Sequence, residues 1–188
     1  MRELSLHLLD IAENSITAHA SEIKIFVEEN TRTDRLIISV KDNGKGMSSE
    51  MVAQVIDPFV TTRTTRKVGL GIPLLKAAAE ASNGKFEIHS KLEQGTRLRA
   101  EFQRSHIDRM PLGDLPGTLL TLFVTNPQIH WIFTYIFNDH TFIYDDEEVK
   151  EVLGDIPLSE PKILSFIRET LETGIRNTRI SFEKLTQE

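Results

Sequence analysis

The sequence predicts an α+β protein: a two-layer α/β sandwich, in which helices cover one face of a mixed sheet, followed by a small acidic α+β appendage. Through residue 103 the predicted elements follow the order helix, two strands, two helices, two strands. Proline and glycine then cluster over residues 106–117, which is typical of a boundary. The chain has 16 basic and 15 acidic residues through Arg109 but 6 and 13 beyond it. We therefore expect one unit over residues 1–108 and a C-terminal extension over 109–188.

The elements of the first unit follow from the spacing of apolar residues. Leu4, Leu8 and Ile11 recur at three- and four-residue steps, which predicts a helix over residues 3–18 with one packed face. Alternation and turn residues predict two hairpins, with strands at 22–29, 35–42, 85–92 and 96–103. Helices are expected over 48–57 and 72–82, and Asn83-Gly84 would end the second. Residues 57–71 show no periodicity and are expected to form a linker.

The extension has weaker signals. Residues 118–126 fit either a helix or a strand, because a short apolar run does not distinguish them. Residues 129–137 and 140–145 flank Asn138-Asp139 and predict a hairpin, in which Trp131, Phe133, Tyr135 and Phe137 form a buried strand face. A short helix is expected over 145–154. A longer one is expected over 160–174, capped by Ser159 and stopped by Gly174.

The composition narrows the classes of function. There is no cysteine, which excludes disulfides and thiolate metal sites and fits a reducing cytoplasm. A net charge of −6 without a concentrated basic face argues against a nucleic-acid binder. Asp10 and Glu13 interrupt the apolar pattern of the N-terminus, and no apolar run approaches the roughly 20 residues that cross a bilayer. We expect a cytoplasmic protein with no membrane partner.

The first cluster with chemical potential is Asp10 and Asn14 on the opening helix. A spacing of four places both side chains on one helix face. An Asn amide oxygen can bind Mg²⁺, and a carboxylate one turn away can orient or deprotonate a water or hydroxyl. The alternative is that both residues simply belong to a solvated face.

The second cluster is Asp42-Asn43-Gly44-Lys45-Gly46-Met47, directly after a predicted strand. An ionised Asp only accepts hydrogen bonds, so Asp42 could accept one from the exocyclic amine of adenine. The two glycines would let the backbone approach a flat base. The alternative is an ordinary Asp-Asn-Gly turn.

The third cluster is the stretch 61–71, which leads into a predicted helix. Gly69 and Gly71 would expose free amides at the positive end of the helix dipole, which is a ready anion site. Arg63, Arg66 and Lys67 add cations within reach of the same phosphates. The stretch lacks the order of a Walker loop or a dinucleotide fingerprint. The alternative is a flexible basic linker.

Together these clusters resemble the N-box and the two glycine boxes of the GHKL family of ATP-binding domains, shared by histidine kinases, type II topoisomerases and mismatch-repair ATPases. DPFVTTR and VGLGIPL are similar to the lid region of sensor histidine kinases, AENSITAHA to the mismatch-repair N-box, and GTRLRAEF to the closing strand. The resemblance covers residues 3–103 and implies the Bergerat-type fold.

The resemblance also implies roles for particular residues. Asn14 would bind Mg²⁺ at the phosphates, and Asp42 would read adenine. Asp10 stands where ATPase and serine-kinase members carry a catalytic Glu and many histidine kinases carry Asn, so we take it as the candidate base. The full set expected to contact the nucleotide is Asn14, Asp42, Gly44, Gly46, Met47, Thr62, Arg63, Lys67, Gly69, Leu70, Gly71 and Thr96.

Two functions follow as expectations, both with ATP and Mg²⁺ as ligands and an unidentified partner protein. The first is phosphoryl transfer in signal transduction, either slow ATP hydrolysis or phosphorylation of the partner, as in anti-sigma-factor kinases or detached histidine-kinase domains. The second is a nucleotide-gated binding module without turnover. His7 lies one turn before Asp10, but we expect a packing or surface residue rather than a phosphoacceptor. His130 and His140 show no carboxylate–histidine spacing along the chain that predicts a metal site.

Overall fold

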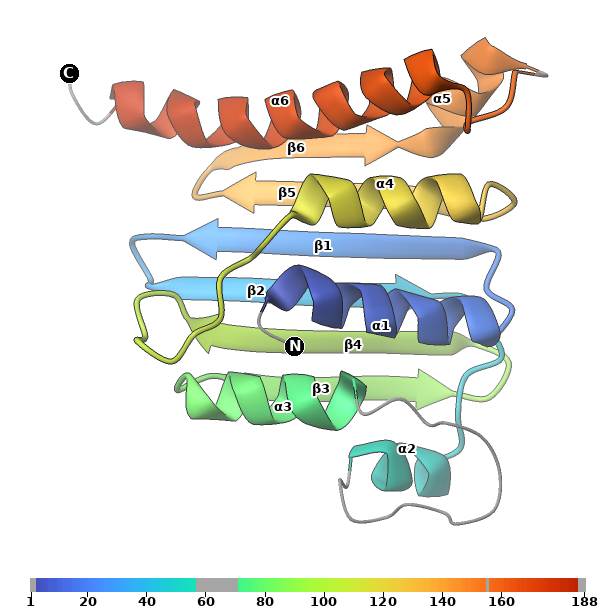
Figure 1. Cartoon of the computed structure of the whole chain (residues 1–188). Coiled ribbons are helices and arrows are strands. Elements are labelled where there is room, and N and C mark those ends of the chain that lie inside the picture. Colours follow the sequence, from blue (N-terminus) through green and yellow to red (C-terminus); the bar gives the residue numbers. More distant parts are fainter. Residues whose placement is uncertain (1–2, 57–70, 155, 186–188) are drawn as a thin grey trace.

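The protein forms a six-stranded mixed sheet with helices packed on one face (Figure 1). The structure is a computed structural model that describes residues 3–56, 71–154 and 156–185, with side chains up to residue 180. The strand order is β3-β4-β2-β1-β5-β6, in which only β1 and β5 pair in parallel. The elements are α1 (Leu4–Thr17), β1 (Glu22–Asn30), β2 (Arg35–Asp42), α2 (Ser49–Ile56), α3 (Gly71–Ala81), β3 (Lys85–Lys91), β4 (Gly95–Gln103), α4 (Leu115–Thr125), β5 (His130–Phe137), β6 (His140–Asp145), α5 (Asp146–Leu153) and α6 (Pro161–Leu185).

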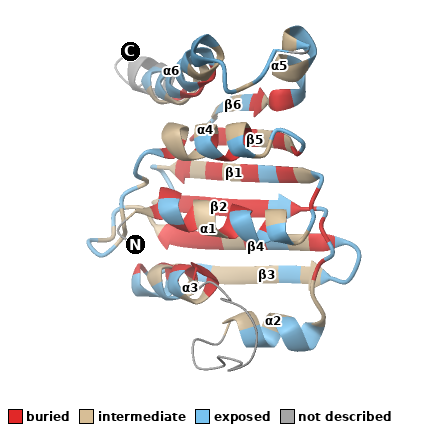
Figure 2. Ribbon diagram, turned by 45° about the vertical axis from the view of Figure 1, so that its right-hand side comes forward, coloured by how far each residue is buried: buried red, intermediate tan, exposed pale blue. Residues whose placement is uncertain are grey.

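The predicted fold class is confirmed. Helices α1, α3, α4 and α6 lie over one face of the sheet, and the side chains that alternate toward them form the core. Figure 2 shows buried residues concentrated in the central strands β1, β2 and β4. On β5, Trp131, Phe133 and Tyr135 are fully buried, as the alternating pattern predicts. The aromatic run is therefore core rather than a ligand site.

Local signals correctly locate several element ends. Asn83 adopts φ 53°, the left-handed conformation that ends a helix, directly after α3. Asn138 adopts φ 52° in the two-residue turn between β5 and β6. The ambiguous run 118–126 is helical up to Thr125, because it belongs to α4. The start of α4 is capped by the Asp114 carboxylate, which accepts from the Gly117 N–H at 3.0 Å.

The predicted stop at Gly174 is wrong, because α6 continues to Leu185. Gly174 instead allows a close approach between α6 and β6. A Cβ atom at this position would lie 2.3 Å from Cε2 of Phe142, well inside van der Waals contact. The glycine therefore makes room for an aromatic ring of the sheet, and the apolar face of α6 continues past it with Ile175.

The chain beyond Arg109 extends the same sheet rather than forming a separate layer. All eight residues of β5 pair in parallel with β1, from His130 opposite Glu22 to Phe137 opposite Glu29. One core contains residues from both segments, for example Leu8 of α1 and Leu171 of α6. The division into two units at residue 108 stays a prediction, and the hydrophobic core crosses it.

A buried ionic network fastens α6 to the end of β1. Glu29 is 7% exposed. Its carboxylate accepts hydrogen bonds from the Tyr135 hydroxyl at 2.8 Å and from the Arg179 guanidinium. Arg104 Nε lies 3.3 Å from Oε2 of the same carboxylate. Burial alone would raise the pKa of Glu29, but Arg179, Tyr135 and Arg104 together lower it below its ordinary value of 4.5. Glu29 therefore stabilises the fold in its ionised form.

We expect Arg179→Met to lower the free energy of unfolding by about 2 kcal/mol in urea titrations at pH 7. Removing one partner of a buried ion pair costs roughly 3–5 kcal/mol. The expected loss is smaller because the Arg179 side chain is 44% exposed and Arg104 still faces Glu29. Because the folded-state pKa of Glu29 is the lower one, its contribution is present above about pH 4.5 and lost as the pH falls through the folded value.

Arg176→Met is the matched control, since Arg176 is an exposed arginine of the same helix whose guanidinium lies 3.4 Å from Thr173 Oγ1. It should change the unfolding free energy by less than about 0.5 kcal/mol. Equal losses in the two variants at pH 7 would contradict a specific role for the Glu29 network.

Candidate functional site

The end of β2 places Asp42 at the centre of a buried hydrogen-bond network. Asp42 is 6% exposed. Its Oδ2 accepts from the Ser15 hydroxyl at 2.7 Å, and its Oδ1 accepts from the backbone N–H groups of Gly44 at 2.9 Å and Thr96 at 3.2 Å. Each carboxylate oxygen can accept two hydrogen bonds, so Oδ2 keeps capacity for one more donor. The carboxylate is therefore held rigidly by α1, the following loop and β4.

The loop after Asp42 is locked against the hairpin of β3 and β4. Gly46 adopts φ 64°, and a Cβ atom there would lie 2.0 Å from the carbonyl oxygen of Lys91, so the position requires glycine. The Met47 N–H donates to Ser90 Oγ at 2.8 Å, and that hydroxyl is also 2.8 Å from Thr96 Oγ1. The structure thus brings Asp42, Gly44, Gly46, Met47 and Thr96 together, and their contact with a nucleotide stays a prediction.

Asp10 lies against the first residue of α3. A Cβ atom built on Gly71 would be 2.9 Å from Asp10 Cβ and 3.1 Å from Asp10 Oδ2, so only glycine lets α3 begin so close to this carboxylate. Asp10 is partly exposed, and Asn14 is exposed one turn later on α1. The two side chains share the helix face that borders the start of α3.

The remaining predicted nucleotide contacts lie outside the described residues. They are Thr62, Arg63, Lys67, Gly69 and Leu70, all within residues 57–70. Their assignment to phosphate binding stays a prediction.

His7 is a buried residue of α1. It is 1% exposed, and burial is the main reason that its pKa is lowered, although the charge of Asp10 opposes the shift. A neutral, enclosed imidazole fits the packing role that we expect and does not fit a phosphoacceptor.

Two residues of the network were not predicted from the motifs. Ser15 holds Asp42 Oδ2, and Ser90 connects Met47 to Thr96 and to the Gly95 carbonyl at 3.1 Å. Ser15 continues the spacing of Leu4, Leu8 and Ile11 along the packed face of the helix. A polar residue at such a position was the signal that could have identified it. Ser90 gives no such signal, because Met47 lies 43 positions away and its contacts with Gly95 and Thr96 depend on the register of the hairpin.

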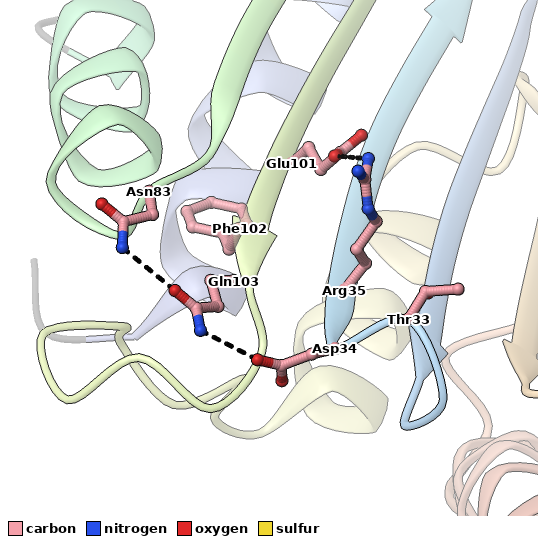
Figure 3. A pocket seen from close by; sticks show the side chains of 7 residues that line it. All are labelled: Thr33, Asp34, Arg35, Asn83, Glu101, Phe102 and Gln103. Atoms are coloured by element: carbon pink, nitrogen blue, oxygen red, sulfur yellow. Dashed lines mark hydrogen bonds and ion pairs between the residues drawn. The ribbon is translucent and has the colours of Figure 1, made fainter.

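A separate pocket of about 270 Å³ lies at the opposite end of β2 from Asp42 (Figure 3). Its polar side chains pair with one another. Asn83 Nδ2 donates to Gln103 Oε1 at 3.0 Å, and Gln103 Nε2 donates to Asp34 Oδ2 at 3.0 Å. Arg35 forms an ion pair with Glu101. These contacts join the turn after β1 to β4 and to the end of α3. Since the polar groups already pair with one another, the pocket gives no reason to assign a ligand.

Comparisons with known proteins agree with the motifs. Residues 2–106 match the family described as histidine kinase-, DNA gyrase B-, and HSP90-like ATPase. A putative sensor protein of Shewanella frigidimarina is 29% identical over 57% of this chain and 17% of its own length. The sensor protein kinase FleS of Pseudomonas aeruginosa is 39% identical over 47% of this chain and 22% of its own. The chain therefore spans about a fifth of the length of these relatives.

Solved structures show the same fold. The MutL ATPase domain of Aquifex aeolicus, complexed with ADP, aligns with a TM-score of 0.50 over 81% of this chain and 69% of that one, at 20% identity. The N-terminal domain of a DNA repair protein aligns with a TM-score of 0.53 over 76% of this chain and 52% of that one, at 12% identity.

No helix of the described residues is both long and apolar enough to cross a membrane. The family match extends over more than half of the chain and includes each cluster of candidate site residues. The chain therefore belongs to the family of histidine kinase-, DNA gyrase B- and HSP90-like ATPases, the GHKL family.

Proposed function

We propose that this protein binds Mg-ATP and carries out phosphoryl transfer in a regulatory role, either by hydrolysing ATP or by phosphorylating a partner protein. The observation that carries the proposal is the contact between Asp10 and Gly71, which puts a carboxylate at the start of α3. The start of a helix attracts phosphate groups through its free N–H groups and its dipole. An acidic side chain at that point is suited to act on the group that attacks a bound phosphate.

The Asp42 network supports adenine as the base. Three donors fix the carboxylate, and the remaining acceptor capacity of Oδ2 suits the exocyclic amine of adenine. Guanine presents a carbonyl at the equivalent position, so two acceptors would face each other. ATP should therefore bind in preference to GTP.

Asn14 supports a magnesium ion at the phosphates. Its exposed amide is on the same face of α1 as Asp10, and an amide oxygen is a suitable ligand for a hard cation that keeps several waters. When bound, Mg²⁺ would offset negative charge on the phosphates. Asp10 would then orient and deprotonate the attacking water or hydroxyl. ATP-dependent chemistry also fits the cytoplasmic location that the composition favours.

A nucleotide-gated binding module is the second candidate, and the link between the Asp42 loop and the C-terminal segment favours it. Asn43 Oδ1 accepts from the N–H groups of Ser21 and Glu22 at 2.9 and 3.0 Å. Ser21 in turn accepts from the His130 N–H of β5 at 2.9 Å. Movement of the loop after Asp42 on nucleotide binding would therefore shift the start of β5, and no ATP hydrolysis is needed for this.

Incubation with γ-labelled Mg-ATP separates these functions. Free labelled phosphate indicates an ATPase, and label retained on protein indicates a kinase. Measurable binding with unchanged ATP, under conditions with and without candidate partners, favours the binding module. Failure to bind ATP at millimolar concentration would contradict both candidates.

Asn14→Ala is expected to weaken ATP binding about tenfold when Mg²⁺ is present and to change it little in EDTA. The loss of one ligand to the metal is worth roughly 1.4 kcal/mol, which is a factor of ten in affinity. Calorimetric titrations with and without chelator measure the difference. Glu13→Ala is the control, because Glu13 is exposed beside Asn14 on α1. A loss of the same size in both conditions indicates a packing role for Asn14 instead.

A further inference from the structure

The first residue of β5, His130, lies among carboxylates that come from three elements of the fold. Its Nε2 is 2.8 Å from Asp145 Oδ1 at the end of β6. On the other side of the ring, Nδ1 is 3.6 Å from Glu147 Oε1 of α5 and 3.7 Å from Glu22 Oε2 of β1. The imidazole is therefore faced by acidic groups on both of its nitrogen atoms.

Asp146 adds a buried carboxylate to this group. It is 2% exposed, and its Oδ1 accepts from the backbone N–H of Trp131 at 2.9 Å. One potential ligand atom each from His130, Asp145 and Asp146 lie within 4.8 Å of one another. Imidazole nitrogen and carboxylate oxygen are both ligands that zinc accepts in proteins.

The charges around His130 do not balance within the described residues. Four carboxylates, from Glu22, Asp145, Asp146 and Glu147, surround the ring. Lys150 Nζ lies 2.6 Å from Asp146 Oδ2, and Lys24 Nζ lies 3.2 Å from Glu22 Oε1. With His130 neutral, the form that binds a metal ion, these two ammonium groups offset half of the negative charge, and a divalent cation would offset the other half.

Helix capping explains only part of the arrangement. Asp145 caps α5 by accepting from the Glu147 N–H at 3.0 Å, which accounts for one acidic residue at this position. It does not account for His130, because the cap of α5 involves only the Asp145 side chain. A groove of about 520 Å³, lined in part by Glu22, His130, Glu147 and Lys150, gives solvent access to the ring.

We propose that His130, Asp145 and Asp146 bind a divalent transition-metal ion with the coordination chemistry of zinc, separately from the magnesium expected at the nucleotide. Zinc binds nitrogen and carboxylate oxygen at about 2.0–2.2 Å, so tetrahedral ligand atoms lie roughly 3.3 Å apart. His130 Nε2 and Asp145 Oδ1 must therefore separate slightly from their 2.8 Å contact. Three protein ligands leave the fourth position to water.

The site adjoins the nucleotide loop through the backbone. His130 N–H donates to Ser21, and Asn43, the neighbour of Asp42, accepts from Ser21 and Glu22. Metal binding at the start of β5 thus acts on residues that also hold the loop after Asp42. The proposed ligands all lie outside the nucleotide loop, so metal binding can be tested without nucleotide.

The test is titration of the tag-free, EDTA-treated chain of 188 residues with Co²⁺ as a spectroscopic probe and with Zn²⁺ as competitor. Trp131 is the single tryptophan of the chain, it directly follows His130, and its backbone N–H donates to Asp146 Oδ1, so its fluorescence is a probe close to this site. We expect one equivalent of Co²⁺ to quench Trp131, with visible absorption typical of tetrahedral coordination. Zn²⁺ should displace Co²⁺, and millimolar Mg²⁺ should not, because imidazole is a poor ligand for Mg²⁺.

His130→Asn and Asp145→Asn should each lower the affinity at least about tenfold, and both substitutions keep a polar side chain at the position. Asn at position 145 can still cap α5, which protects the fold. His140→Asn, at the other end of β6, and Asn14→Ala, in the proposed magnesium site, should bind Co²⁺ as the wild type does. The proposal is overturned if the wild type binds no Co²⁺ at micromolar concentration, if His130→Asn binds it equally well, or if Mg²⁺ displaces it.

Discussion

Asp10→Asn is expected to lower ATP turnover by about 10²- to 10⁴-fold while leaving nucleotide affinity nearly unchanged. A general base acts in the transition state, so its removal affects the rate far more than ground-state binding. The substitution keeps the size of the side chain, which matters because Asp10 Oδ2 would be only 3.1 Å from a Cβ atom at Gly71. Rates of phosphate release and calorimetric affinities for the wild type and the variant measure the two effects separately.

Glu13→Gln is the matched control, since it removes a carboxylate from the exposed side of the same helix. Its turnover should equal that of the wild type. Phosphate release by Asp10→Asn at the wild-type rate would refute Asp10 as the base. If Asp10→Asn abolishes hydrolysis but still transfers the phosphoryl group to a histidine acceptor, the protein acts as histidine kinases do. Many histidine kinases carry Asn at the corresponding position, as this variant does.

The helices and strands of this protein could be predicted from local patterns, because those patterns arise from the sheet and helix faces that pack in the core. The aromatic alternation of β5 and the Asn turns after α3 and β5 are examples. Gly174 misled the prediction because glycine is typical both of a helix end and of a close helix–strand contact. Only the position of Phe142, 32 residues earlier in the chain, distinguishes these two uses.

The strand order could not be predicted in the same way. The pairing of β5 with β1 joins residues about 108 positions apart, such as Glu22 and His130, and no local signal encodes it. The same pairing brings His130 close to Glu22 and, through β6, to Asp145. The carboxylate–histidine cluster is therefore a property of the sheet and is not visible in residue spacing along the chain.

More of the candidate nucleotide site could be proposed from the sequence, because most of its groups lie in short contiguous motifs. Asp42, Gly44, Gly46 and Met47 form one loop, and the structure connects that loop to Thr96. A polar residue on the buried face of α1 was the one sign of Ser15, and Ser90 shows no sign of its function until its hydrogen-bond partners are known.

Asp42→Asn is expected to weaken ATP binding by roughly 10²-fold and to reduce the preference for ATP over GTP. A hydrogen bond to a charged acceptor is worth about 1.5–3 kcal/mol, and the variant lacks that charge. Asn keeps one oxygen for the N–H groups of Gly44 and Thr96, and its amide can donate to the Ser15 hydroxyl. The amide then presents a donor where the carboxylate offered an acceptor, which disfavours the adenine amine and suits the guanine carbonyl.

The measurement is a pair of calorimetric titrations, with ATP and with GTP, on the wild type and on two variants. Asp139→Asn is the control, because Asp139 is exposed in the turn between β5 and β6, at the other end of the sheet from Asp42. It should leave both affinities unchanged. Because Asp42→Asn also weakens a buried network, its unfolding free energy must be measured beside its affinity. A loss of stability without a change in the ATP-to-GTP ratio would mean that Asp42 only supports the loop. A loss of the ATP preference in a stably folded variant would mean that Asp42 reads the base.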